Sequence, residues 1–180
     1  MFPRTYRDLK RLEYVWGRRA GFNCKPFSFD DLLVWIENLG AIPLQDRTVK
    51  VTTFLFYRDK KFILYNTGAN PLELLLSLGH EAGHLALGHY ETGELLPHAP
   101  SLWARNGLEK DAGIVGFLCW LPTPEFERIL QKTEPHPEVL ANELATCDSE
   151  WPFLLKASEA RLRIWRGLRK ISKHRHSFFD

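Results

Sequence analysis

The sequence has few cysteines and no long hydrophobic run. Its 180 residues include three cysteines, Cys24, Cys119 and Cys147, whose spacing fits neither a zinc cluster nor a disulfide framework. No apolar run approaches the roughly 20 residues that cross a bilayer, and the charged N-terminal segment does not have the pattern of a cleavable signal peptide. We therefore expect a reduced, cytoplasmic protein with no membrane partner.

Neither sign of charge dominates the chain, since the formal net charge is only +2. The distribution is uneven, however, with six Lys/Arg against two acids in residues 1–20 and eight against two in residues 156–180. The simpler interpretation is a pair of solvated helices with cationic faces. The alternative is that the basic C-terminus meets an acidic partner or a nucleic acid, which we do not favour. A content of 44% apolar and 13% aromatic residues is typical of a globular protein.

The most informative motif is His80-Glu81-Ala82-Gly83-His84, which lies inside a strongly apolar run. Two histidines four residues apart lie on the same face of a helix, so both imidazoles can reach one cation. The glutamate beside the first histidine can then take a proton from a metal-bound water. This spacing is typical of zinc-dependent hydrolases.

The segment around the motif has clear helix boundaries. Asn70 is a good N-cap, Pro71 suits the first helical position, and Gly88 provides a C-terminal stop. Between them the residues are largely apolar, which predicts a buried helix. Two buried histidines and a glutamate need polar partners, and a metal supplies them.

The third metal ligand decides the class of site. A three-histidine pattern needs a histidine at position 90, where the chain has Tyr90; His89 misses by one residue. The other class takes a carboxylate from a later helix, and Glu109 and Asp111 open the next apolar segment. Because they are two residues apart on a helix, at most one of them can face the metal squarely.

The elements around this helix predict an α+β fold. Residues 49–57 and 61–66 have β character and indicate a hairpin, while residues 4–19, 109–121, 138–147 and 157–172 favour helices. We expect a small sheet that contains antiparallel strands and packs on the metal-binding helix. Residues 1–130 would form this core, and residues 131–180 a small, basic, helical subdomain resembling a helix-turn-helix unit.

Taken together, residues 80–89, the acid–x–acid–Ala start at 109–112 and the apolar stretch ending in Pro at 118–122 resemble the ImmA/IrrE metallopeptidases. The interval between the last two segments fits the family without a gap, and the hairpin sits where the family has one. The resemblance covers residues 25–125. It implies a minimal zincin-like core of the gluzincin type with extra C-terminal helices.

The resemblance also implies a mechanism. The third ligand falls on Asp111, where the family usually has Glu, so that His80, His84 and Asp111 would hold the metal; Glu109 is the alternative. Zinc is the metal that these ligands favour, with manganese as the alternative. Glu81 would be the general base, and the candidates for the oxyanion stabiliser or a supporting role are Tyr90, His89, His98 and Tyr65.

By the same resemblance, the expected function is that of a zinc-dependent endopeptidase. Its substrate would be a cytoplasmic helix-turn-helix repressor of a phage, a mobile element or a stress regulon. Two alternatives come from other classes of protein. One is a DNA-binding regulator, and the other is a non-catalytic, metal-sensing interaction protein with a vestigial peptidase site.

Overall fold

The computed structural model describes residues 3–91 and 107–176. The elements of these residues follow the order α1 (Pro3–Ala20), α2 (Phe29–Asn38), β1 (Ala41–Gln45), β2 (Thr53–Tyr57), β3 (Lys60–Tyr65), α3 (Pro71–Ala86), η1 (His89–Glu91), α4 (Gly107–Trp120), α5 (Thr123–Leu130), α6 (Pro137–Leu144), η2 (Asp148–Glu150) and α7 (Trp151–His176). The expected α+β class is confirmed. Among the described residues, no helix combines the length and the apolar character needed to span a bilayer.

The three strands form one mixed sheet in the order β1-β3-β2. β1 runs parallel to β3, and β2 pairs antiparallel with β3 as the predicted hairpin. The hairpin turns at Arg58 and Asp59, whose φ angles of 47° and 61° are both positive. Two positive φ angles are the requirement of the tight hairpin turn whose twist matches that of the strands.

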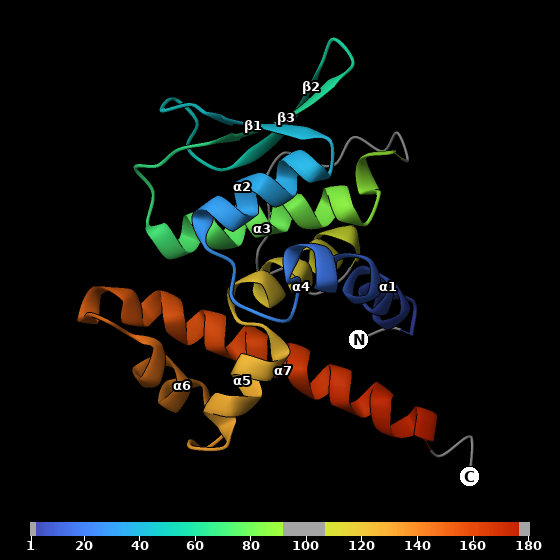
Figure 1. Cartoon of the computed structure of the whole chain (residues 1–180). Helices are drawn as coiled ribbons and strands as arrows, with labels where there is room; N and C mark the ends of the chain where they lie inside the picture. The colour runs from blue at the N-terminus through green and yellow to red at the C-terminus, as the bar shows by residue number, and fades with distance from the viewer. Residues whose placement is uncertain (1–2, 92–106, 177–180) are drawn as a thin grey trace.

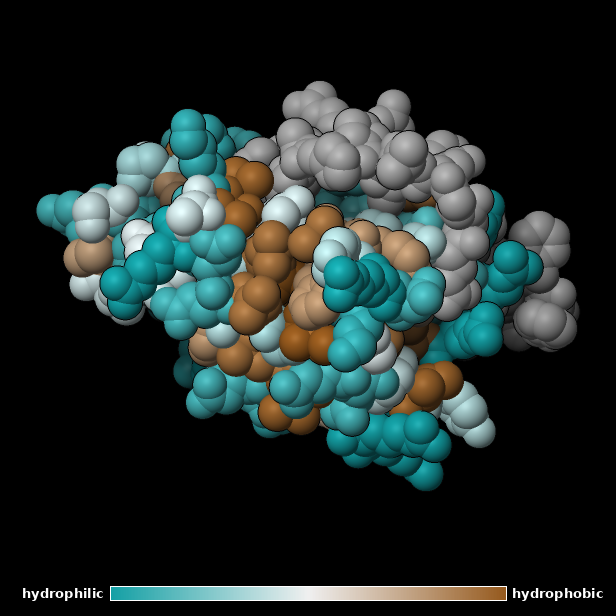
Figure 2. Space-filling view, turned by 90° about the horizontal axis from the view of Figure 1, so that it is seen from above, coloured by the Kyte–Doolittle hydropathy of each residue, from teal (hydrophilic) through white to brown (hydrophobic). Residues whose placement is uncertain are grey.

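One face of the sheet is covered and the other is open. α2 packs against β1, and α3 packs against β3 and α2, so these helices form the layer beneath the sheet (Figure 1). On the opposite face Ile42, Leu44 and Leu55 are exposed, and the view from above shows apolar side chains gathered there (Figure 2). The main core lies on the helical side. Its centre is Trp35, which is fully buried and stacked on Phe22 with 5.5 Å between ring centroids.

The helix that carries the histidine motif begins and ends as the sequence predicts. The Asn70 side chain accepts hydrogen bonds from the backbone N–H groups of Leu72 and Glu73, and Pro71 occupies the first turn. Gly88 follows the helix with a φ of 72°, a conformation that glycine adopts without steric cost. α3 is therefore fixed at both ends by local sequence.

Glycines bring α3 and α4 into unusually close contact. A Cβ atom on Gly79 would lie 2.9 Å from the Cα of Gly116, and one on Gly83 would lie 2.8 Å from the carbonyl oxygen of Ala112. Side chains at these positions would force the two helices apart. The start of α4 therefore lies directly beside the histidine motif.

The C-terminal helices attach to this core at two places. α7 contributes Ala157, Ala160 and Ile164 to the main core. Between Ala160 and Ile164, Arg161 is fully buried, and its Nε donates to the carbonyl oxygen of Leu121 over 2.7 Å. α6 has 8 residues and α7 has 26, so the second helix is far longer than the first. The predicted boundary at residue 130 and the helix-turn-helix comparison stay predictions.

Candidate metal centre

The two histidines of the motif face each other inside the protein. His80 and His84 are 0% and 2% exposed, one turn apart on α3, and their Nε2 atoms are 3.0 Å apart. The helical period predicts this pairing. Burial, reinforced by the nearby His80, lowers the pKa of His84 to about 3. The imidazole of His84 is therefore neutral, which is the form that binds a metal.

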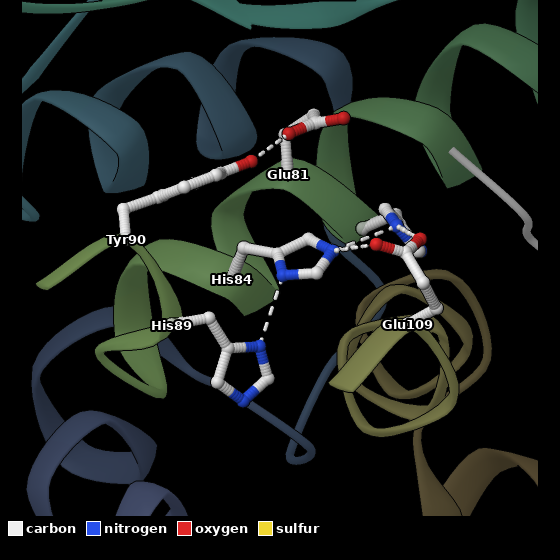
Figure 3. A network of polar contacts seen from close by, with 6 residues as sticks. Glu81, His84, His89, Tyr90 and Glu109 are labelled. Atoms are coloured by element: carbon white, nitrogen blue, oxygen red, sulfur yellow. Dashed lines mark hydrogen bonds and ion pairs between the residues drawn. The ribbon is translucent and has the colours of Figure 1, made fainter. Parts of the chain in front are cut away.

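One carboxylate completes the cluster, and it is that of Glu109 on the first turns of α4. Its Oε2 lies 3.1 Å from Nε2 of His80, and its Oε1 lies 3.3 Å from Nε2 of His84 (Figure 3). One ligand atom from each of the three residues falls within 4.8 Å of the others, the only such group found in residues 3–91 and 107–176. The side chain of Glu109 is 20% exposed, so the cluster is open on that side.

The expected first choice of third ligand, Asp111, does not face the histidines. Its Oδ1 accepts a hydrogen bond of 2.9 Å from the hydroxyl of Thr5 on α1. Two residues on a helix are about 200° apart around its axis, so a helix that points Glu109 at the histidines turns Asp111 away. Asp111 instead lines a cavity of about 410 Å³ between α1 and the start of α4. The alternative ligand, Glu109, occupies the expected place.

The donor set has the ligand types and the spacing of a tetrahedral metal site. Zinc held at about 2.0–2.1 Å by tetrahedral ligands places neighbouring ligand atoms roughly 3.3 Å apart. The Nε2 atoms of His80 and His84 are 3.0 Å apart, and a different oxygen of Glu109 faces each of them, Oε2 at 3.1 Å from His80 and Oε1 at 3.3 Å from His84. Two imidazoles and one carboxylate also form the ligand set of many catalytic zinc sites.

A third histidine, His89, contacts His84 at the ring nitrogen that does not face Glu109. Nδ1 of His89 lies 2.9 Å from Nδ1 of His84, and the two rings cross at 71° (Figure 3). Burial lowers the pKa of His89 to about 4. Both rings are therefore neutral, and one of the two nitrogens carries the shared proton. If His84 donates it, the tautomer leaves Nε2 of His84 free to bind a metal.

Glu81 is buried on the other side of His84, with 4% of its surface exposed. The hydroxyl of Tyr90 donates a hydrogen bond to its carboxylate (Figure 3). Burial raises the pKa of Glu81 to about 7, although the Tyr90 hydrogen bond acts in the opposite direction. A carboxylate that exchanges its proton near neutral pH is suited to general base catalysis.

Tyr90 also connects this carboxylate to the sheet. Its ring stacks on that of Phe54 in β2, with centroids 3.6 Å apart and planes at 9°. The edge strand of the sheet is therefore in direct contact with the residue that binds Glu81. The local sequence did not predict this contact between Phe54 and Tyr90.

The four residues expected to assist the site fall into three groups. Tyr90 and His89 lie at the cluster. Tyr65 belongs to the main core on β3, where its ring meets the edge of Phe29 at 5.5 Å. His98 lies outside the described residues. Sequence reasoning also missed Thr5, which is 106 residues from its partner and precedes the segment covered by the resemblance.

Fold and site together define a class: an α+β protein with a two-histidine, one-carboxylate cluster beside a buried glutamate. Comparison of the chain with protein-family models, with curated proteins and with solved structures finds no match in any of the three.

Proposed function

We propose that the protein is a zinc-dependent endopeptidase with a minimal zincin-like core, in which His80, His84 and Glu109 hold the metal. The observation that carries the proposal is the convergence of these three side chains next to a buried glutamate. A structural metal site needs no such glutamate, whereas a hydrolytic one needs a proton acceptor beside the water.

The residues of the chain divide the chemistry between them. Bound zinc would polarise the scissile carbonyl and lower the pKa of a coordinated water to about 7. Glu81 accepts the proton that leaves the attacking water, and passes it to the amine nitrogen as the C–N bond breaks. The Tyr90 hydroxyl has one proton, which it donates to Glu81; once Glu81 has taken up the water proton, the hydroxyl donates instead to the carbonyl oxygen as that oxygen becomes negative.

The sheet supports a protein as the substrate. β2 lies at one end of the strand order β1-β3-β2, and an extended peptide can add to such an edge through main-chain hydrogen bonds. Because Phe54 of β2 stacks on Tyr90, this edge leads to the candidate site. The exposed apolar face formed by Ile42, Leu44 and Leu55 is typical of protein contact surfaces. By the family resemblance, the substrate is a cytoplasmic helix-turn-helix repressor.

The test compares Glu81→Gln with His84→Ala and the wild type. We expect Glu81→Gln to retain zinc in elemental analysis and to lose all cleavage of a proteome-derived peptide library read by mass spectrometry. His84→Ala should lose both. Zinc-loaded wild type that cleaves no peptide, or Glu81→Gln that cleaves at the wild-type rate, would refute the peptidase proposal.

The same variants distinguish the non-catalytic alternative, for which the buried cluster is the supporting observation. A metal-sensing interaction protein needs the metal ligands and does not need the base. In that case Glu81→Gln behaves as wild type in every assay, whereas His84→Ala loses the metal-dependent change in stability or partner binding.

A further inference from the structure

The outward face of α1 carries a straight row of cations. Arg4, Arg7, Arg11, Tyr14 and Arg18 are separated by three or four residues, and all are exposed. We call this row the arginine stripe. At 1.5 Å per residue it extends over roughly 21 Å of helix. The opposite face, with Thr5, Leu9 and Leu12, is buried in the protein.

Few carboxylates neutralise the arginine stripe. Asp8 lies 3.8 Å from Arg4 and 3.9 Å from Arg7, distances longer than a hydrogen bond, and the two arginine side chains are 80% and 73% exposed. Arg11 and Arg18 lie within 4 Å of no carboxylate among the described residues. At least two of the four guanidinium groups are therefore available to an external anion.

The neighbouring helix adds charge of the same sign. α7 packs against α1, and its second half runs below α1 towards the C-terminus (Figure 1). Four basic side chains of α7 are exposed there: Arg163, Arg166, Arg169 and Lys170. The two packed helices therefore both carry exposed positive charge in this part of the molecule.

We propose that the arginine stripe binds a duplex nucleic acid through its phosphate backbone. A duplex carries one charge per about 1.7 Å of axis, so it offers phosphates along the whole stripe. Arginine forks bind phosphate oxygens through two hydrogen bonds, and an exposed tyrosine hydroxyl also donates to phosphate. The proposal is independent of the peptidase function.

Other occupants fit the stripe less well. A protein interface has an apolar centre with few charges, and the stripe has only the ring of Tyr14 to offer, which is 87% exposed. A second copy of the chain would bring like charges together. A membrane-surface helix inserts its apolar face, and that face of α1 is already buried in the core.

The experiment measures binding of the full chain to a fluorescent 24-base-pair duplex by anisotropy at a series of salt concentrations, with DNA and RNA duplexes in separate arms. The variant Arg7→Gln/Arg11→Gln/Arg18→Gln removes three exposed cations. The matched control Arg47→Gln/Lys50→Gln/Lys60→Gln removes three exposed cations from the sheet side of the molecule. Circular dichroism checks that both variants are folded.

The wild type should bind at low salt, and the logarithm of its affinity should fall with the logarithm of salt concentration. Because each phosphate contact contributes about 0.9 to that slope, the stripe variant should lose about 2.7 of it and the single variant Arg11→Gln about 0.9. The control should keep the wild-type slope. Binding to either duplex in this pattern supports the proposal, and the arms identify which nucleic acid is preferred.

Three results would overturn it. The first is no binding of the wild type to either duplex at low salt. The second is an equal loss in the stripe variant and in the control, which would indicate a general effect of net charge. The third is stronger binding of polyglutamate than of either duplex, which would assign the stripe to an acidic protein.

Discussion

Replacing Gly83 by alanine should damage both the fold and the candidate metal centre. A Cβ at this position would lie 2.8 Å from the carbonyl oxygen of Ala112, 3.0 Å from its Cα and 3.0 Å from Cβ of Val115. Two of these three atoms belong to the backbone of α4, and the third is fixed to it. No side-chain rotation can relieve the overlap, so α3 and α4 must separate.

The size of the effect follows from two opposing contributions. Alanine favours a helix over glycine by about 1 kcal/mol, which stabilises the variant. Overpacking costs about 1–3 kcal/mol, and because the contacts here are with backbone atoms we place the cost at the upper end, about 2–3 kcal/mol, which leaves a net loss of about 1–2 kcal/mol. For a chain of this length that corresponds to a fall of about 2–8 °C in melting temperature. Glu109 lies one turn before Ala112, so the shift also moves its carboxylate away from His80 and His84.

Thermal and urea unfolding measure the stability, and competition with a chromophoric chelator measures zinc affinity. Gly17→Ala is the matched control, because a Cβ there meets only ordinary contacts at 3.6 Å. Gly17 lies inside α1, so its replacement should stabilise the protein by about 0.5–1 kcal/mol and leave zinc affinity unchanged. A Gly83→Ala protein as stable as the wild type and with full zinc affinity would refute the close-contact argument.

Three other predictions address separate parts of the structure. Elemental analysis should find zinc retained in Asp111→Ala and lost in Glu109→Ala; the reverse result would restore Asp111 as the ligand. Burial raises the pKa of Glu81 to about 7 even though the Tyr90 hydrogen bond partly offsets it; Tyr90→Phe removes that offset, so the pKa should rise further and the acid limb of the pH–activity profile should move to higher pH. An acid limb that stays in place or moves to lower pH would contradict the effect of Tyr90 on the pKa of Glu81. Arg161→Ala leaves a cavity and an unpaired main-chain carbonyl, so urea unfolding should show a loss of about 2–4 kcal/mol; a loss below 1 kcal/mol would contradict that role.

Features that depend on neighbouring residues could be predicted from the sequence. Asn70 and Pro71 fix the start of α3, and Gly88 fixes its end, each through the backbone geometry of a single position. The hairpin follows from two β-rich segments around a short polar turn. The pairing of His80 with His84 follows from the helical period alone.

Features that depend on how helices pack could not be predicted in this way. Glu109 and Asp111 both lie near the start of α4, and only the rotation of that helix against α3 decides which one meets the histidines. That rotation is set by the contact at Gly83, 26 residues before Glu109 in the chain. The resemblance favoured Asp111 because it compares positions in a sequence and does not include α1, whose Thr5 holds Asp111 on the other side.

The hydrogen bonds of the cluster add a constraint on how strongly it can hold a metal. Nδ1 of His80 is buried and has no hydrogen-bond partner among the described residues. To bind a metal through Nε2, His80 must carry its proton on Nδ1, which leaves a buried donor unpaired at a cost of about 1–3 kcal/mol. His84 has no such cost, because His89 faces its Nδ1. Loss of such an outer hydrogen bond typically weakens metal affinity by about 10–100-fold. As metal ligands, His80 would therefore be the weaker of the two histidines, and His89 would strengthen binding by His84.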